Sequence, residues 1–288
     1  MRLEGLLLMS IIVSLLSGPT VSAATGSSPA SLSRQAVVVR TANWQSCQGS
    51  LQRYERSSVQ EVWQPAGKAI PVVVGRNGLA WGLGLHPIRG ETPFCPTNER
   101  SGRIPRRPPL PAAGKDTEAP PDSAERGNDG DPGKREGDGR SPAGVFSLSG
   151  AFGYAPGGEC PWIKLPYREA TSTLKCIDDI RSRHYNRLVN AGEEPKDWSS
   201  CEEMRRPDDQ YRLGIVVEHN AAPAIPDRGS CIFIHIWKGP EVGTAGCTAM
   251  APEDMETLLR WLDPAAVPVL IQLPESAYRQ LKGPWELP

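Results

Sequence analysis

Hydrophobic and polar positions in the N-terminal third of the chain follow the short periods of β-strands. Segments rich in β-branched residues alternate with a period of two or run continuously for four or five positions. Glycine-containing turns, such as the one at Gly75–Gly78, separate them, which is typical of an antiparallel meander. The strands predicted in this part span 36–40, 51–56, 61–63, 70–74 and 79–81.

The second half of the chain combines further strands with short helices. Pro252 can open a helix over 252–262, where acidic residues fill the first turn and apolar residues recur at helical spacing. A short helix is also predicted over 274–281, and a helical piece near 179–189. Strands are predicted over 145–148, 211–219, 231–237 and 267–273. The pattern as a whole predicts a mainly β fold (β-rich α+β) with a few short helices.

The predicted strand over 231–237 is apolar on both faces. One face carries Cys231, Phe233, His235 and Trp237, and the other carries three isoleucines. Strands with two apolar faces are buried inside sheets, since neither face can meet water without cost. We therefore expect His235 to lie at the centre of the fold.

The segment over 97–133 departs from this pattern. It is rich in proline, glycine and charge, and its large apolar residues are Ile104 and Leu110. Such a segment buries too little apolar surface to offset the entropy lost on ordering. Because a strand pattern resumes after it, we interpret it as a disordered insertion within a single domain spanning 35–282. Residues 24–34 are rich in Ser, Ala and Gly, and we expect a flexible N-terminus there.

The first residues have the pattern of a secretory signal peptide. Arg2 provides the positive start, and the apolar run Leu6–Leu16 is too short to span a bilayer comfortably. Gly18 and Pro19 interrupt the run, and Val21–Ala23 has the small residues that signal peptidase cuts after. The sequence predicts removal of residues 1–23, export to the periplasm or cell envelope, and no stable membrane insertion of the mature chain.

Charge and cysteine content narrow the possibilities further. The net charge of −1 provides no electrostatic basis for binding nucleic acid, and no pattern indicates an oligomeric state. The chain has seven cysteines, so an exported protein could form three disulfides, in any of 15 pairings, and leave one thiol free. Cys247 is our choice for the free thiol because it follows a glycine-rich loop. Alternatively, fewer bridges form and several thiols are simply buried.

The pairing of Cys247 with His235 is the strongest candidate for chemistry. The two residues are 12 positions apart, and the loop between them contains three glycines and a proline that let the chain return to the strand. An imidazole beside a thiol can take its proton and later protonate a leaving group. Gly246 would permit an unusual backbone conformation and leave room for a substrate carbonyl. The alternatives are a core histidine, a structural disulfide, or a zinc site that adds His219.

Two stretches then reveal a resemblance. His235-Ile236-Trp237 and Gly243–Thr248 resemble the catalytic signature of bacterial L,D-transpeptidases, which are cysteine enzymes that remodel peptidoglycan. Residues 70–82, 134–144 and 216–220 resemble an exported branch of that family. The resemblance extends from about Trp44 to Leu273 and is interrupted by the insertion.

The resemblance implies a fold in which a curled mixed β-sheet or β-sandwich surrounds the active site. It also implies acyl transfer between peptidoglycan stem peptides without a cofactor or a metal. Cys247 would be the nucleophile and His235 the proton donor and acceptor. The thiolate would attack the carbonyl of the third residue of a tetrapeptide stem and release D-Ala. An amine of a second stem would then take the acyl group, which gives a 3→3 cross-link.

The resemblance also suggests roles for neighbouring residues. Gly246 and Thr248 would support the loop and the oxyanion. The family more often has a histidine where this chain has Ala245, so His219 or Asn220 could supply the missing polar contact to substrate. Trp237 and Arg76 are further candidates for substrate binding, because an arginine can hold the carboxylates of an anionic stem.

Other functions remain open from the sequence. With water as the acceptor, the same pair would make an L,D-carboxypeptidase. A non-catalytic envelope module that binds peptidoglycan would keep the fold without needing the thiol. A cysteine protease of the papain type fits less well, because its cysteine precedes its histidine in the chain.

Overall fold

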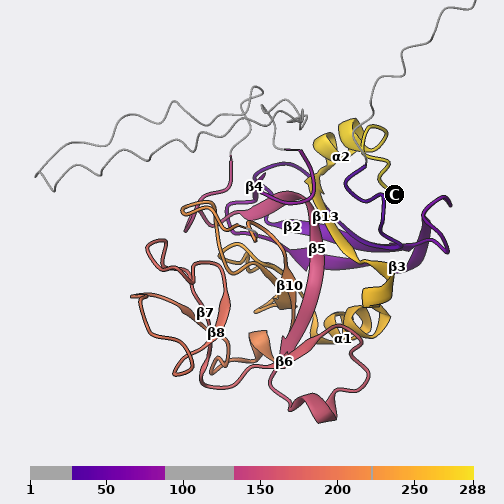
Figure 1. The fold of residues 1–288 in the computed structure, drawn as a ribbon. Helices are drawn as coiled ribbons and strands as arrows, with labels where there is room; N and C mark the ends of the chain where they lie inside the picture. The colour runs from indigo at the N-terminus through magenta and orange to yellow at the C-terminus, as the bar shows by residue number, and fades with distance from the viewer. Residues whose placement is uncertain (1–27, 88–132, 222) are drawn as a thin grey trace, which may run out of the picture.

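The computed structural model describes residues 28–87, 133–221 and 223–288 (Figure 1). The predicted signal peptide at 1–23 lies outside these residues, as does the predicted insertion at 97–133 except for Gly133. Within the described part of the chain, no helix is long and apolar enough to cross a membrane.

One large mixed sheet forms most of the fold, as Figure 1 shows. Its strands are β1 (Gln35–Thr41), β2 (Gln48–Glu55), β3 (Gln64–Val73), β4 (Leu79–Trp81), β5 (Ser141–Gly153), β6 (Tyr167–Glu169), β10 (Leu213–Val217), β11 (Phe233–Ile236), β12 (Thr248–Met250) and β13 (Val269–Pro274).

The large sheet curls until it closes on itself. The strands follow the order β10-β11-β12-β3-β2-β1-β13-β5, and β5 also pairs with β10. Most pairs are antiparallel, but β1 runs parallel to β13, and β11 runs parallel to β12. The prediction of a mainly β fold with a curled mixed sheet is therefore confirmed. Closure removes most free edges and brings strands from both ends of the chain to one core.

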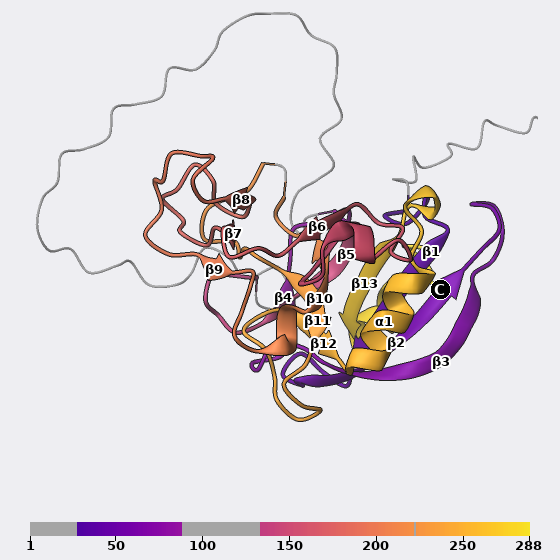
Figure 2. The same ribbon diagram turned by 90° about the horizontal axis from the view of Figure 1, so that it is seen from below.

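A second, smaller sheet lies on the side of the molecule away from β3 (Figures 1 and 2). It consists of β7 (Leu174–Cys176), β8 (Leu188–Asn190) and β9 (Glu202–Glu203), with β7 in the middle. A disulfide joins Cys176 on β7 to Cys231, which lies just before β11. This bond links the small sheet to the large one. The small sheet therefore cannot move freely relative to β11.

Two α-helices pack against the large sheet. Helix α1 (Pro252–Trp261) contacts β10 and β11 and buries Met255, Leu258 and Leu259, as the apolar stripe predicted. Helix α2 (Glu275–Leu281) contacts β13 and β1. Short 3₁₀ turns lie at η1 (Gly157–Glu159), η2 (Asp209–Tyr211) and η3 (Pro264–Ala266). Proline at the first helical position and acidic residues in the first turn explain where α1 begins.

Two local predictions are wrong. Residues 61–63 are not a strand, because β3 begins at Gln64 and continues through the expected break to Val73, paired with β2 across a bulge. The helical piece predicted near 179–189 consists of turns that lead into β8. Asp179 there accepts hydrogen bonds from the backbone of Arg181 and Ser199, and such local bonds compete with a helix.

Residues 28–34 are more ordered than the predicted flexible N-terminus. The Arg56 guanidinium donates to the carbonyl oxygens of Ala30, Ser31 and Ser33, and Ala30 is buried. One arginine therefore fixes three carbonyl groups in a segment whose own composition predicts disorder.

Among the described residues, Cys176–Cys231 is the one disulfide, and Cys47, Cys160, Cys201 and Cys247 are free thiols. Cys95 lies outside the described residues. Three bridges cannot form with these four thiols free, so the alternative of fewer bridges holds. The expectation that Cys247 is a free thiol is met.

Candidate active site

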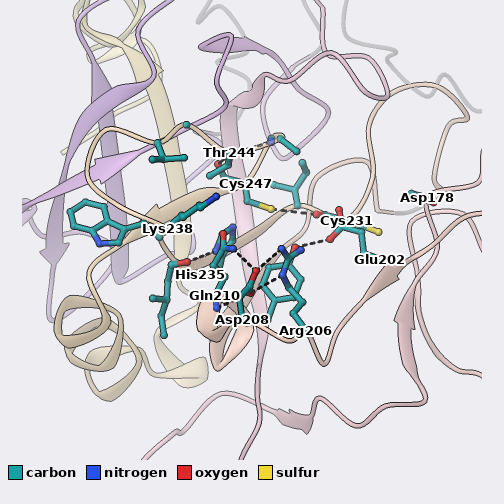
Figure 3. Close-up of a pocket in the computed structure, with 18 of the residues that line it drawn as sticks. Asp178, Glu202, Arg206, Asp208, Gln210, Cys231, His235, Lys238, Thr244 and Cys247 are labelled. Atoms are coloured by element: carbon teal, nitrogen blue, oxygen red, sulfur yellow. Dashed lines mark hydrogen bonds and ion pairs between the residues drawn. The ribbon is translucent and has the colours of Figure 1, made fainter.

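A cleft of about 710 Å³ lies between the two sheets and contains both predicted catalytic residues (Figure 3). The end of β11 and the loop before β12 provide one wall, which includes His235 and Cys247. Residues of β9 and η2 provide the opposite wall, which includes Glu202 and Tyr211. The cleft is therefore built from segments that are distant in sequence.

The parallel pairing of β11 and β12 brings the histidine and the cysteine to one face. His235 lies opposite Ala249 and Ile234 lies opposite Thr248, so Cys247 falls beside Phe233, two residues before the histidine. The Phe233 N–H donates to the Cys247 Sγ at 3.3 Å. The thiol in turn donates to the Cys231 carbonyl oxygen at 3.6 Å. Both side chains therefore face the cleft from neighbouring strands.

Two hydroxyl groups hold the cysteine backbone in place. Ser141 Oγ and Thr244 Oγ1 both donate to the Cys247 carbonyl oxygen, at 2.9 Å and 2.6 Å. Ser141 Oγ also accepts the Gly75 N–H at 2.8 Å, so β5 and the end of β3 are linked to Cys247 through one side chain. A Cβ at Gly75 would lie 2.5 Å from the Gly139 carbonyl oxygen, so this approach requires glycine. The loop is therefore fixed before substrate binds.

Gly246 plays a different part from the one expected. Its φ is not positive, so it does not adopt the special conformation that the sequence suggested. Space explains the glycine instead, because a Cβ would lie 3.2 Å from the Arg140 carbonyl oxygen and 3.3 Å from Ile232 Cδ1. The Gly246 N–H donates to Thr244 Oγ1 at 3.1 Å, which closes the turn before Cys247.

Hydrogen bonding distinguishes His235 from the two other buried histidines that lie against the large sheet. Its Nδ1 lies 2.8 Å from the Ile236 carbonyl oxygen, so Nδ1 carries the proton and Nε2 keeps a free lone pair. In His86 and His219, Nδ1 accepts a backbone N–H, and Nε2 lies near a carbonyl oxygen. The ring nitrogens of His86 and His219 are therefore occupied by hydrogen bonds. Of these three histidines, only His235 has a lone pair available to act as a base.

The cleft holds its thiol and imidazole in neutral forms. Burial, and to a lesser degree the nearby Glu202 carboxylate, raises the pKa of Cys247 to about 12. Burial lowers the pKa of His235 to about 4, although its bond to the Ile236 carbonyl opposes the shift. At neutral pH the resting pair is therefore a thiol beside a neutral base, rather than a thiolate–imidazolium pair.

Two residues of the opposite wall were missed by the sequence analysis. The Tyr211 hydroxyl donates to Glu202 Oε2 at 2.6 Å, and the tyrosine ring packs edge-on against the His235 ring, with centroids 5.1 Å apart. The same hydroxyl lies close enough to the Cys247 thiol to lower its pKa. Neither residue lies near the catalytic motif in sequence, and Tyr211 had been interpreted only as the start of a strand.

Lys134 is a third such residue. Its side chain is 4% exposed, and its ammonium lies 2.6 Å from Asp138 Oδ1. It lines the cleft, and its positive charge lowers the pKa of Cys247. It stands at the start of the stretch 134–144, which the resemblance had marked without giving Lys134 a role.

The structure does not bring every predicted residue into the cleft. His219 and Asn220 lie outside it, and Asn220 bonds instead to the backbone of Ile225 and Gly229. Arg76 is exposed and joins the loop only through its backbone N–H, which donates to Thr244. Thr248 is buried and donates to Gln272 Oε1 at 2.6 Å, away from Cys247.

Trp237 does line the cleft, beside Lys238 at the end of β11. Within the described ranges, no three His, Cys, Asp or Glu side chains come together in a way that could hold a metal ion. The arrangement is a thiol on a fixed loop, with a free imidazole nitrogen on the same face of a cleft. Such an arrangement is suited to covalent acyl chemistry at a cysteine.

Comparison with known proteins gives one match. No curated protein and no solved structure matches the chain significantly. The model of the L,D-transpeptidase catalytic domain family (YkuD) matches residues 62–271, which include the cleft and both catalytic candidates. This match covers more than half of the chain, so the chain belongs to the L,D-transpeptidase catalytic domain family.

Proposed function

We propose that the protein is a peptidoglycan L,D-transpeptidase with Cys247 as nucleophile and His235 as proton donor and acceptor. The donor would be a tetrapeptide stem, attacked at the carbonyl of its third residue, and the acceptor would be an amine of a second stem. The observation that carries the proposal is the free Nε2 of His235 on the same face as the Cys247 thiol. A structural histidine would have its lone pair occupied, as in His86 and His219.

Acylation would proceed from the neutral pair. The thiol, which at rest donates to the Cys231 carbonyl, would give its proton to His235 Nε2 as sulfur attacks the donor carbonyl. The Cys247 N–H makes no hydrogen bond to the described residues, so it can donate to the developing oxyanion. The imidazolium would then protonate the nitrogen of the departing D-Ala, which leaves a thioester on Cys247. Lys134 would favour the charge that develops on sulfur.

The proposal includes export to the cell envelope, which the N-terminal sequence supports. Intact mass measurement of protein recovered from the envelope should then give a chain that starts at Ala24. A chain that still begins at Met1 would contradict this part of the proposal.

The direct test is mass spectrometry of purified muropeptides incubated with the mature protein, beside the Cys247→Ala variant. We expect loss of D-Ala and a new dimer with the native protein, and neither with the variant. Loss of D-Ala without a dimer would instead establish an L,D-carboxypeptidase that uses water. Unchanged muropeptides would refute the enzyme and favour a module that only binds peptidoglycan.

A further inference from the structure

Tyr211 and Glu202 form a hydrogen-bonded pair in the cleft, separate from His235. The tyrosine donates its hydroxyl proton to Glu202 Oε2, and its oxygen retains lone pairs that can accept another proton. That hydroxyl also lies next to the Cys247 thiol. Both residues line the cleft. A group attached to the Cys247 sulfur would therefore lie close to both His235 and the Tyr211–Glu202 pair.

The fold holds this pair firmly. Glu202 lies on β9 opposite Cys176 of β7, and Cys176 is bridged to Cys231, whose carbonyl oxygen accepts the Cys247 thiol. The Tyr211 ring packs against the rings of Phe152, Phe233 and His235. The hydroxyl and the carboxylate are therefore anchored from both sheets, as a group that transfers protons needs to be.

Acyl transfer to an amine that enters the cleft as an ammonium needs a second proton acceptor. A primary amine enters as an ammonium with three hydrogens on nitrogen, and the amide product keeps one of them. Two protons therefore leave the nitrogen as the C–N bond forms and the C–S bond breaks. His235 can return one proton to the Cys247 sulfur, which restores the thiol. The other goes to solvent if the amine binds in its neutral form, and to a second group in the cleft if the amine binds as an ammonium.

We propose that Glu202 accepts this second proton through the Tyr211 hydroxyl, so that the pair serves the acceptor amine while His235 serves the sulfur. The Tyr211 oxygen would take a proton from the incoming ammonium as its own hydroxyl proton passes to Glu202. Glu202 then becomes a carboxylic acid and loses its proton to solvent between turnovers. The proposal rests on the transpeptidase function above and specifies how its acceptor is activated.

The electrostatic surroundings of Glu202 suit this task. Desolvation by burial raises its pKa to about 7, which makes it a stronger base than an exposed carboxylate. The hydrogen bond from Tyr211 and the positive charge of Arg206 lower this pKa, whereas the charges of Asp178 and Glu136 raise it. At pH above about 7 the carboxylate is ionised and can attract an ammonium group.

The test separates the two half-reactions with Tyr211→Phe and Glu202→Gln. The thioester is first formed with a tetrapeptide donor and measured by intact mass and D-Ala release, and an amine acceptor is then added. Tyr211→Phe keeps the ring packing, and Glu202→Gln keeps the shape. Glu203→Gln is the matched control, because Glu203 is the exposed neighbour on β9 that pairs with Lys175.

We expect both variants to form the thioester within about 3-fold of the native rate but to transfer it to the amine about 100-fold more slowly, the loss usual for one acid–base group. As pH drops through about 7, where the amine is already an ammonium, protonation of Glu202 should add a fall to the transfer rate of the native protein. Glu202→Gln should lack this additional fall. The Glu203→Gln control should match the native protein in both steps.

Three outcomes would overturn the inference. Transfer at the native rate in both variants would show that the pair takes no proton. Equal losses in thioester formation and transfer would show a role in packing alone. Loss of transfer in Glu202→Gln with an unchanged pH profile would show that Glu202 only positions Tyr211. If the native protein itself forms no thioester, the transpeptidase function fails instead, and the two failures are distinguishable.

Discussion

Buried histidines should make the protein lose stability in mild acid, and His219 allows a clean measurement. Its Nδ1 accepts the Leu83 N–H and its Nε2 lies 2.8 Å from the Arg228 carbonyl oxygen, so the ring fits this site only when neutral. Burial lowers its pKa from 6.5 to about 4. The unfolded chain therefore binds the proton first, and stability falls as pH drops below about 6.5 and continues to fall to about 4.

The size of the effect follows from these two pKa values. The His219 ring should cost about 2 kcal/mol of stability at pH 5 and about 3 kcal/mol at pH 4, relative to pH 8. His219→Gln removes this titration. The variant should be less stable than the native protein at pH 8, but the difference in unfolding free energy should shrink by about 2 kcal/mol at pH 5.

Urea unfolding followed by tryptophan fluorescence at pH 8, 7, 6 and 5 measures this difference directly. Titrating groups that do not interact with His219 are shared by both proteins and cancel, whereas His86, whose charge also lowers the pKa of His219, does not cancel fully. His86→Gln should behave in the same way, because burial also lowers the pKa of His86 to about 4. Thr257→Ala, at an exposed position on α1, should show a difference independent of pH. A constant difference for His219→Gln between pH 8 and pH 5 would refute the reasoning.

Two further predictions concern the parts that hold the cleft together. Thr244→Val removes the hydroxyl that donates to the Cys247 carbonyl oxygen. We expect about 1 kcal/mol less stability and roughly 10-fold slower D-Ala release. An unchanged rate would show that Ser141 alone is enough to hold the Cys247 carbonyl in place. Replacing both Cys176 and Cys231 with Ala opens a loop with a sequence separation of 55 and should cost about 4 kcal/mol in urea unfolding. A loss no larger than that of Cys201→Ala, a free cysteine beside β9, would contradict it.

The candidate pair of His235 and Cys247 could be proposed from sequence because its signals are local. One apolar strand carries His235, and the glycine-rich loop after it leads directly to Cys247. The parallel pairing of β11 with β12 then brings the two side chains to one face. Helix α1 was equally predictable, because its proline start and its apolar stripe lie within a few turns of chain. In both cases the residues on which the prediction rests lie within one short segment of the chain.

The opposite wall of the cleft could not be predicted in this way. Glu202 lies on a two-residue strand, and Tyr211 ends a 3₁₀ turn, so neither belongs to a long periodic segment. Their proximity to Cys247 depends on one disulfide pairing and on the closure of the large sheet. Periodicity carries no information about such long-range contacts, and cysteine spacing leaves many pairings open. The sequence alone therefore predicts the wall that carries His235 and Cys247, but not the opposite wall.

The two histidines His219 and His235 also differ in a way that the sequence does not predict. His219 and His235 both fall within predicted apolar strands, and the sequence offers His219 for substrate contact and His235 for proton transfer. What separates them is a single hydrogen bond: Nδ1 of His219 accepts a backbone N–H, whereas Nδ1 of His235 donates to a carbonyl oxygen. The backbone groups involved come from Leu83 and Ile236. The first is distant in sequence, so its contact appears only in the folded protein.

The neutral resting pair also explains how a reactive thiol and a disulfide can exist side by side. Cys176 and Cys231 form a disulfide, while Cys247 remains a free thiol next to them. Oxidants and disulfides react with thiolate far more readily than with thiol. Burial raises the pKa of Cys247 to about 12, so the free protein exposes almost no thiolate at neutral pH. In the proposed reaction, attack would begin only when a substrate occupies the cleft and His235 Nε2 takes the thiol proton.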